Sequence, residues 1–445
     1  MKKQYDVIIV GCGVAGCFTA LHLPQNKEIL MIAKSDLEES DSFLAQGGIC
    51  VLKDEQDYDS FYEDTMRAGH YQNRPESVDI MIRSSREVID ELIKYGVDFT
   101  KENGELSYTK EGAHSTNRIL YHADITGKEI TSKLLAEVKR RENITLMSHT
   151  TMIDILCHDN CCDGILLKNK DGEIQPVFAQ NVMWACGGIG GVYENSTNFP
   201  QLTGDALALS LRHKIRLQDV DYVQIHPTTL YSKKKERRFL ISESVRGEGA
   251  HLYDKNGNRF ANELLPRDLL TQEIHKQMEK DGTDHVWLSM LPIEDMDVTK
   301  RFPNITKKCL EEGYDVTKEW IPVVPAQHYF MGGVYVDKNS STSMRHLYAA
   351  GETSCNGVHG KNRLASNSLL ESLVFAKNAA LHMTEMDKEC QDAGRFSKNL
   401  DLSIKDLADI YQLFIEEYEN EEEFHKKNKE LVLEEIRRSA EERSK

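Results

Sequence analysis

The 445-residue sequence lacks an excess of basic residues, an apolar leader and a long hydrophobic run. Its 55 lysines and arginines are outnumbered by 72 aspartates and glutamates, which leaves a net charge of −17 at pH 7. A field of that sign repels phosphates and argues against binding to nucleic acid or to an anionic membrane. The first six residues contain no apolar stretch, so no secretory signal is expected. Glycines and His22 interrupt residues 7–23, so we expect no membrane span and a cytoplasmic protein.

The ten cysteines raise the question of metal binding. Without a secretory signal they are expected to be reduced thiols rather than disulfides. Residues 157–162 read Cys-His-x-x-Cys-Cys, a spacing that resembles a set of metal ligands. They lie between two β-like runs, at residues 151–156 and 164–167, that are joined by Asn and Asp-Gly. We therefore predict a hairpin tip and no metal site.

The first 32 residues predict a β-α-β unit. An apolar run at residues 6–10 leads into the motif G-x-G-x-x-G, formed by Gly11, Gly13 and Gly16, and then into a helical pattern. A second apolar run at residues 28–32 completes the unit. In this arrangement the first glycine allows a tight turn, the second admits a pyrophosphate, and the helix N-terminus attracts its charge.

The motif lacks one element that is expected for binding a nicotinamide dinucleotide. A carboxylate normally ends the second strand and binds the ribose, but Ala33 and Lys34 occupy that place, and the first acid is Asp36. Further strands are predicted at residues 180–185 and 346–350, and each runs into glycine. A sheet with strands so far apart in sequence must contain an insertion.

We predict an α/β protein in which a Rossmann-like domain carries an inserted α+β capping domain and a short C-terminal helical segment. The discontinuous first domain covers residues 1–220 and 325–385, the capping domain residues 221–324, and the tail residues 386–445. The basic run at residues 233–238 is expected to be an exposed loop. In the tail, an apolar stripe at residues 407–418 predicts a docked helix, and the charged residues 416–445 predict a solvated one.

Blocks spread over about residues 5–375 resemble the succinate dehydrogenase and fumarate reductase flavoprotein family. They start at Ser42, His226, Glu243, Pro266, His328, Ala349 and His359, in family order. Residues 111–118, 123–127 and 364–368 resemble most closely its L-aspartate oxidase branch. The resemblance implies FAD as the cofactor, contacted by Gly11, Gly13, Ala15, Gly16, Lys34, Ser42, Ala45, Gln46, Gly47, Gly48, Gly187, Gly188, Asp205, Gly351, Glu352, Asn367, Ser368 and Leu369.

The same resemblance implies a four-carbon dicarboxylate substrate, for which arginine is a suitable bidentate partner. The implied substrate-binding residues are His226, Thr228, His328 and Arg363, and the implied catalytic residues are Glu111, Glu243, Arg246 and Arg267. The implied reaction is oxidation of L-aspartate to iminosuccinate with oxygen or fumarate as acceptor, the first step of NAD biosynthesis through quinolinate. Quinolinate synthase is the implied recipient of the labile product.

Two residues separate this reading from its alternatives. Membrane-bound members of the family attach FAD to a histidine, but Asp41 stands at that place, which implies non-covalent FAD. Glu111 would pair with the substrate ammonium, although by residue type alone it is a surface acid in a polar loop. The alternatives are a soluble fumarate reductase or succinate dehydrogenase-type flavoprotein, an FAD protein without catalysis, and an NAD-dependent dehydrogenase.

Overall fold

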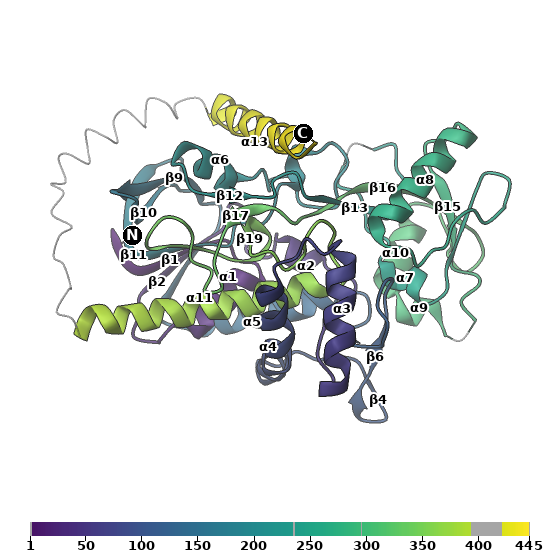
Figure 1. Cartoon of the computed structure of the whole chain (residues 1–445), viewed down its shortest axis with the longest axis horizontal. Helices are drawn as coiled ribbons and strands as arrows, with labels where there is room; N and C mark the ends of the chain where they lie inside the picture. The colour runs from purple at the N-terminus through teal and green to yellow at the C-terminus, as the bar shows by residue number, and fades with distance from the viewer. Residues whose placement is uncertain (1, 235, 295, 393–420, 445) are drawn as a thin grey trace.

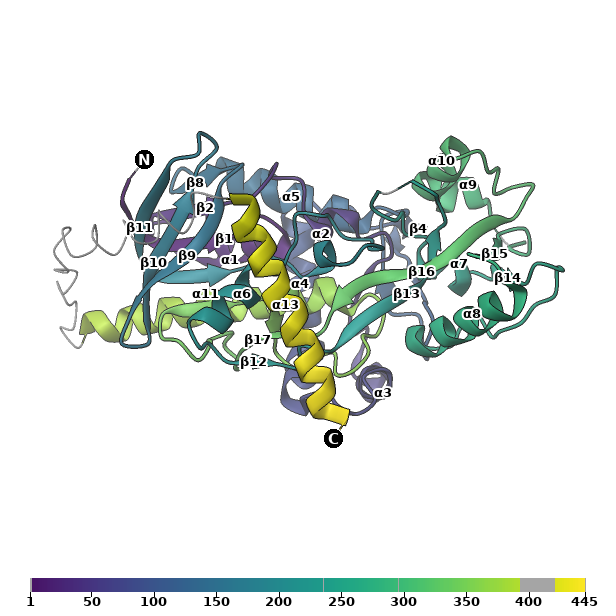
Figure 2. The ribbon, with the colours of Figure 1, turned by 90° about the horizontal axis from the view of Figure 1, so that it is seen from above.

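A seven-stranded mixed sheet forms the centre of the larger part of the molecule (Figures 1 and 2). The computed structural model describes residues 2–234, 236–294, 296–392 and 421–444. The strand order is β8 (Ile144–Met147), β2 (Ile29–Ile32), β1 (Gln4–Val10), β11 (Ile174–Trp184), β10 (Cys161–Lys168) and β9 (Thr151–His158), and β18 (Leu347–Ala349) also pairs with β11. Strands β1, β2, β8, β11 and β18 are parallel, and β10 is antiparallel to both neighbours. The predicted β-α-β unit and the two later strands are confirmed.

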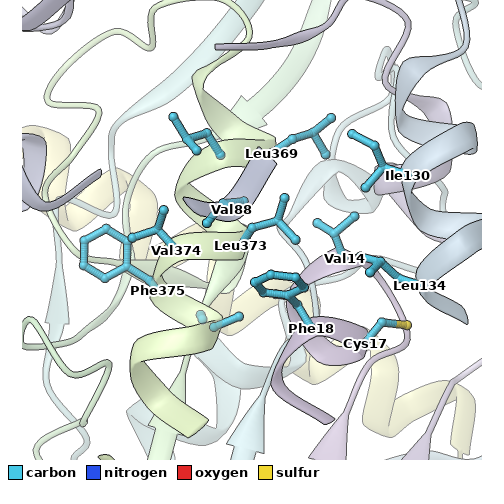
Figure 3. Packing of buried hydrophobic residues seen from close by; sticks show 14 of the residues in the cluster. Val14, Cys17, Phe18, Val88, Ile130, Leu134, Leu369, Leu373, Val374 and Phe375 are labelled. Atoms are coloured by element: carbon cyan, nitrogen blue, oxygen red, sulfur yellow. The ribbon is translucent and has the colours of Figure 1, made fainter. Parts of the chain in front are cut away.

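The two faces of the sheet have separate cores because side chains alternate along each strand. Val7 and Ile9 of β1 face helices α1 (Val14–His22), α4 (Pro75–Lys94), α5 (Thr126–Arg140) and α11 (Asn367–Asp392). On this face Phe18 of α1 packs near Leu373 of α11 and Leu134 of α5 (Figure 3). The opposite face packs against α6 (Asp205–Arg212) and the small sheet β12 (Leu217–Gln218), β17 (Gly333–Tyr335) and β19 (Ser354–Cys355). Both faces are therefore covered, as parallel strands require.

A second, antiparallel sheet follows at the other end of the molecule (Figure 1). Its order is β13 (Val223–Leu230), β16 (Ile321–Phe330), β15 (Val286–Ser289) and β14 (His251–Tyr253). Four helices accompany it, α7 (Glu243–Gly247), α8 (Arg267–Asp281), α9 (Val298–Arg301) and α10 (Pro303–Glu311). This part has its own apolar cluster, which includes Leu252, Leu270 and Leu288. The α/β fold class is confirmed, while the division into domains stays a prediction.

Short elements connect these parts, and two of them, α2 and η3, contribute residues to the central cavity. They are α2 (Asp41–Leu44), β3 (Ile49–Cys50), η1 (Glu55–Asp57), α3 (Tyr58–Ala68), β4 (Lys101–Glu102), β5 (Glu105–Leu106), β6 (Tyr108–Thr109), β7 (Ile119–Leu120), η2 (Gly190–Val192) and η3 (Gly351–Thr353). Strands β3, β7 and β6 form one small sheet, and β4 and β5 form another. Within the described residues, the structure has no helix long and apolar enough to cross a membrane.

The C-terminal helix α13 (Glu421–Ser444) corrects the prediction of a solvated segment. It lies across the α6 side of the molecule (Figure 2). Val432 is fully buried in a cluster with Ile189 and Phe330. Near the end of the helix, the Arg443 guanidinium donates to the carboxylates of Asp219 and Asp221. A few apolar positions are enough to dock a charged helix, and the predicted stripe at residues 407–418 lies outside the described residues.

Two loop predictions have different outcomes. The hairpin at residues 157–162 is confirmed, because β9 and β10 pair antiparallel and its two tip residues, Asp159 and Asn160, both have positive φ. The strands are longer than predicted, so the cysteines belong to the ladder and Gly164 lies at a bulge beyond the turn. The basic run was predicted to be exposed throughout, which is wrong for Arg237. Its guanidinium turns inward, donates to Thr197 O at 3.1 Å and lines the central cavity.

Candidate active site

One cavity of about 440 Å³ joins the glycine motif to the second sheet. The predicted site residues that line it are Gly11, Gly13, Ala15, Lys34, Ser42, Ala45, Gln46, Gly47, Gly48, Glu111, Gly187, Asp205, His226, Glu243, Arg267, His328, Gly351, Glu352, Arg363, Ser368 and Leu369. The predicted residues Gly16, Gly188, Thr228, Arg246 and Asn367 are not among its lining residues. Its volume lies within the range of about 300–1,000 Å³ that is usual for ligand pockets.

The glycine motif forms a cradle at one end of this cavity. Gly11 has φ +113°, and a Cβ there would approach Ala185 O to 2.1 Å, so another residue could not make the turn. Gly13 precedes α1 and provides no side-chain cap for its amides. Gly16, the third glycine of the motif, lies in α1, where a Cβ would meet Gly11 O at 2.0 Å. The Ser42 hydroxyl accepts from Val14 N at 3.2 Å at this helix N-terminus, and a helix N-terminus with a close backbone approach fits a pyrophosphate.

Polar side chains from three other segments, which follow β2, follow α2 and form η3, complete the cofactor end of the cavity. The Lys34 ammonium, which replaces the usual ribose acid, donates to Asp205 at 2.9 Å at the start of α6. Gln46 Oε1 is buried and has no hydrogen-bond partner among the described residues. Glu352 accepts a hydrogen bond from Phe330 N at 3.0 Å, and burial followed by the charge of Asp41 raises its pKa well above the usual value. Gln46 and Glu352 therefore offer polar atoms that a bound cofactor could satisfy.

At the other end, two arginines from distant segments meet on one glutamine. Gln224 Oε1 accepts from Arg267 Nη1 at 2.8 Å and from Arg363 Nε at 3.3 Å. Its amide nitrogen donates to Asn362 Oδ1 and to Arg363 O, both at 2.8 Å. Burial, and then the charge of Arg267, lowers the pKa of Arg363 to about 10. Both side chains stay cationic at neutral pH and form a fixed pair of carboxylate-binding forks.

Arg267 belongs to a buried chain of charges. Its Nε donates to Glu243 Oε2 at 2.6 Å, and Arg246 Nη2 approaches the same oxygen at 3.5 Å. Burial opposes the ionisation of Glu243, but the charges of Arg267 and Arg246 outweigh it and hold its pKa below the usual value. The three predicted residues are therefore together, with Arg267 at the cavity and Arg246 behind it.

The two predicted histidines lie side by side, with ring centroids 5.1 Å apart. His226 Nδ1 lies 3.0 Å from Thr228 O and 3.2 Å from Thr228 N, and its buried Nε2 has no partner among the described residues. The hydroxyl of Thr197 holds His328 Nδ1 at 2.8 Å. Burial, and then the charge of Arg267, lowers the pKa of both histidines well below the usual value. Neutral rings can each offer one N–H to a substrate carboxylate. Thr228 does not line the cavity, and its own backbone contacts His226 Nδ1 and so positions that ring.

Glu111 is a buried acid, not the exposed one that its residue type suggested. Its side chain is 3% exposed and lines the cavity. The hydroxyls of Ser244 and Ser366 donate to its two oxygens, each at 2.6 Å. A carboxylate held on both sides in this way is fixed in direction, and it faces the same cavity as the two arginines.

Several residues that shape the site carry no local sequence signal. Gln224 joins the arginines, Ser244 and Ser366 hold Glu111, and Thr197 holds His328. Arg237 lines the cavity beside Asp41 and lowers the pKa of that acid against the larger effect of burial, which leaves it raised to about 7. These residues belong to the site because the fold brings them close to it, and a pattern along the sequence cannot show such contacts.

The glycine cradle, the sheet order and the second sheet together define a dinucleotide-binding flavoprotein of the oxidoreductase class. The family model described as "FAD binding domain" matches residues 6–369, so the cofactor is FAD. A variant of E. coli quinol fumarate reductase has a similar structure, with a TM-score of 0.84 and 28% identity over 94% of this chain and 75% of that chain. The predicted FAD-binding fold is confirmed.

Among curated proteins, the chain is 48% identical to the L-aspartate oxidase of Clostridium perfringens, over 89% of this chain and 92% of the relative. It is 47% identical to the L-aspartate oxidase of Clostridium acetobutylicum, over 92% of this chain and 94% of the relative. The chain therefore belongs to the L-aspartate oxidase family.

Proposed function

We propose that the protein oxidises L-aspartate to iminosuccinate, using FAD as the cofactor. One observation carries the choice of substrate: a single cavity holds two carboxylate-binding arginines and a fixed carboxylate, Glu111. An amino dicarboxylate offers two anionic groups and one cation, which this set complements. Succinate and fumarate have no cationic group for Glu111.

We assign binding and orientation to the arginines and histidines. Arg363 and the neutral N–H groups of His226 and His328 bind the carboxylates, while Glu111 pairs with the ammonium. Such charge-assisted hydrogen bonds are each worth about 1.5–3 kcal/mol. Bound FAD supplies the acceptor for the hydride that leaves the α carbon. Holding the substrate in one pose supplies much of the rate, because orientation lowers the entropic part of the barrier.

We assign proton transfer to the chain of Arg267, Glu243 and Arg246, in which Arg267 is the residue nearest the substrate. Its guanidinium is fixed by Gln224 and Glu243, so its remaining N–H groups face the cavity in one direction. Glu243 links it to Arg246, and the chain can move a proton between the cavity and the interior. A free arginine is a poor base, with a pKa of about 12.5 or more, so the neighbouring charges must assist it.

Three further elements belong to the proposal. FAD is bound without a covalent bond, because Asp41 stands where a histidine would carry it, and release of free FAD by acid precipitation tests this. Oxygen or fumarate reoxidises the cofactor. Iminosuccinate hydrolyses in water, so direct transfer to quinolinate synthase would protect it, and a co-sedimentation assay with that enzyme tests the transfer.

Anaerobic flavin bleaching tests the substrate. L-Aspartate, D-aspartate and succinate are added separately to the purified yellow protein, and the flavin absorbance is followed. We expect L-aspartate to bleach it rapidly, because its carboxylates and ammonium all find partners. Bleaching by succinate but not by L-aspartate would reverse the assignment in favour of a succinate or fumarate enzyme.

Replacing one arginine tests the geometry. Arg363→Leu should abolish turnover and leave FAD bound, because the side chain lines the substrate end of the cavity. Arg216→Leu is the matched control, since that arginine stacks on Tyr335 at 3.8 Å and does not line the cavity. Unchanged turnover in Arg363→Leu would remove this residue from the substrate site.

A further inference from the structure

A cysteine, a histidine and an aspartate form a second chemical cluster, outside the cavity. Cys157 lies near the end of β9 and is exposed. Its sulfur is 3.5 Å from Nδ1 of His213, the residue that ends α6. The other ring nitrogen, Nε2, is 2.6 Å from Asp154 Oδ1. Asp154 is 2% exposed, so the histidine is anchored from the protein side and faces the thiol.

The charge on the histidine suits it to act on the sulfur. Burial opposes the protonation of His213, but Asp154 and then Cys157 outweigh it and raise its pKa to about 9. At neutral pH the ring is an imidazolium, so Nε2–H donates to Asp154 and Nδ1–H is directed at the sulfur. This cationic donor lies where it can give its proton to a group that departs as the sulfur reacts.

A second thiol lies directly across the β ladder. Cys162 of β10 is the register partner of Cys157. Its N–H donates to Arg345 O, on the other side of the strand, so the two cysteines form a non-hydrogen-bonded pair. Such pairs have Cα atoms about 4.5 Å apart, within the range of about 4.4–6.8 Å that a disulfide requires.

The two cysteines have different surroundings. Cys162 is 1% exposed, and burial raises its pKa, with a further rise from Cys157 and Asp163. It therefore stays a thiol, while Cys157 is open to solvent. The titratable groups near Cys157 come from the elements around it: His213 at the end of α6, Asp154 from its own strand through that histidine, and Cys161 and Cys162 from β10.

We propose that Cys157 is a peroxide-reactive thiol that closes a disulfide with Cys162. The Cys157 thiolate attacks one oxygen of a hydroperoxide, forming an S–O bond as the O–O bond breaks, and His213 gives its proton to the departing oxygen. Sulfur loses two electrons, and the peroxide is reduced to water or an alcohol. The Cys162 sulfur then attacks the Cys157 sulfenic acid, forming the S–S bond, and its proton leaves with the hydroxyl as water.

The site is independent of the proposed oxidation of L-aspartate. Cys157, Cys162 and His213 do not line the central cavity. The reaction needs a hydroperoxide and no amino acid, so it can be measured whether or not L-aspartate reduces the flavin. Hydrogen peroxide is the probe.

The test exposes the full-length holoenzyme to hydrogen peroxide at neutral pH and maps its cysteine peptides by mass spectrometry. We expect the peptide containing Cys157 and Cys162 to lose two hydrogen atoms. In Cys162→Ala the sulfenic acid should persist and be trapped by dimedone at Cys157. Cys186, which is partly exposed and lines the central cavity, serves as the internal control in the same digest. We expect Cys157 to react at least about tenfold faster than Cys186.

Variants of the histidine separate chemistry from exposure. His213→Gln and Asp154→Asn should each slow oxidation of Cys157 by up to about tenfold, because the departing oxygen then loses its positioned proton donor. Retained FAD absorbance and circular dichroism show that each variant is folded. Equal rates at Cys157 and Cys186, or an unchanged rate in folded His213→Gln, would overturn the proposal. A wild-type sulfenic acid that forms no disulfide would overturn the role of Cys162.

Discussion

Replacing Glu111 with glutamine should change which dicarboxylate the protein prefers. The substitution keeps the size of the side chain and removes its charge. Ser244 and Ser366 can still bond to an amide, because a hydroxyl both donates and accepts. The fold and the cofactor site are therefore expected to be unchanged. The interaction that is lost is the one between Glu111 and the ammonium of the substrate.

The expected magnitude follows from one charge-assisted hydrogen bond. Such a bond is worth about 1.5–3 kcal/mol, which corresponds to roughly 10- to 150-fold in binding. L-Aspartate should lose that factor in kcat/KM. Succinate has a hydrogen where aspartate has its ammonium group, so its affinity should be unchanged or higher once the nearby negative charge is gone.

Two measurements on Glu111→Gln decide the matter. Anaerobic stopped-flow absorbance gives the rate of flavin reduction by L-aspartate, and a titration of the flavin spectrum gives the dissociation constant of succinate. Glu91→Gln is the control, because that carboxylate pairs with His22 and Lys377 outside the cavity. Equal losses for both ligands would refute the reasoning, since Glu111 would then act on the whole site and not on the amine.

Three further predictions concern contacts seen in the structure. Gln224→Met removes the acceptor shared by Arg267 and Arg363, and kcat/KM should fall by roughly 10- to 150-fold with FAD retained, measured by steady-state kinetics and flavin absorbance. Arg443→Leu should lower the free energy of unfolding by about 1 kcal/mol in urea, since solvent screens its 38% exposed side chain; an equal loss in Arg438→Leu, the control on the same helix, would contradict the docking contact. His213 has a pKa raised from 6.5 to about 9, so its stabilisation is complete below pH 6.5 and lost as pH rises through 9. The difference in urea stability between wild type and His213→Gln should shrink over that window, and a constant difference would argue against the Asp154 ion pair.

The sequence was most informative where structure is local. The strand at residues 6–10, the turn at Gly11 and the following helix form one continuous segment, so periodicity and glycine spacing predicted them correctly. The hairpin at residues 157–162 was predicted for the same reason. These elements need only neighbours in the chain to specify them.

The substrate end of the cavity could not be predicted from local patterns. Gln224 lies in β13, and the two arginines that it joins lie 43 and 139 residues later. No local pattern marks such a glutamine, so only the family resemblance predicted that the two arginines belong to one substrate site. The docking of α13 was missed because its apolar run at residues 431–433 is short and lies in a charged segment, and because the partners of Val432, Ile189 and Phe330, are remote in sequence.

Charge balance explains why this cavity suits an amino acid better than a plain diacid. The buried cations Arg246, Arg267 and Arg363 face the carboxylates Glu111 and Glu243, and the neutral histidines add no charge. Within this group of five charged side chains one positive charge is left over, which matches the single net negative charge of L-aspartate at neutral pH. A doubly negative succinate would leave the buried site with a net charge, and an unbalanced charge in a low-dielectric interior is costly. If Glu111 were neutral the balance would shift by one unit, and succinate would become the better-matched ligand, which gives the Glu111→Gln experiment its sign.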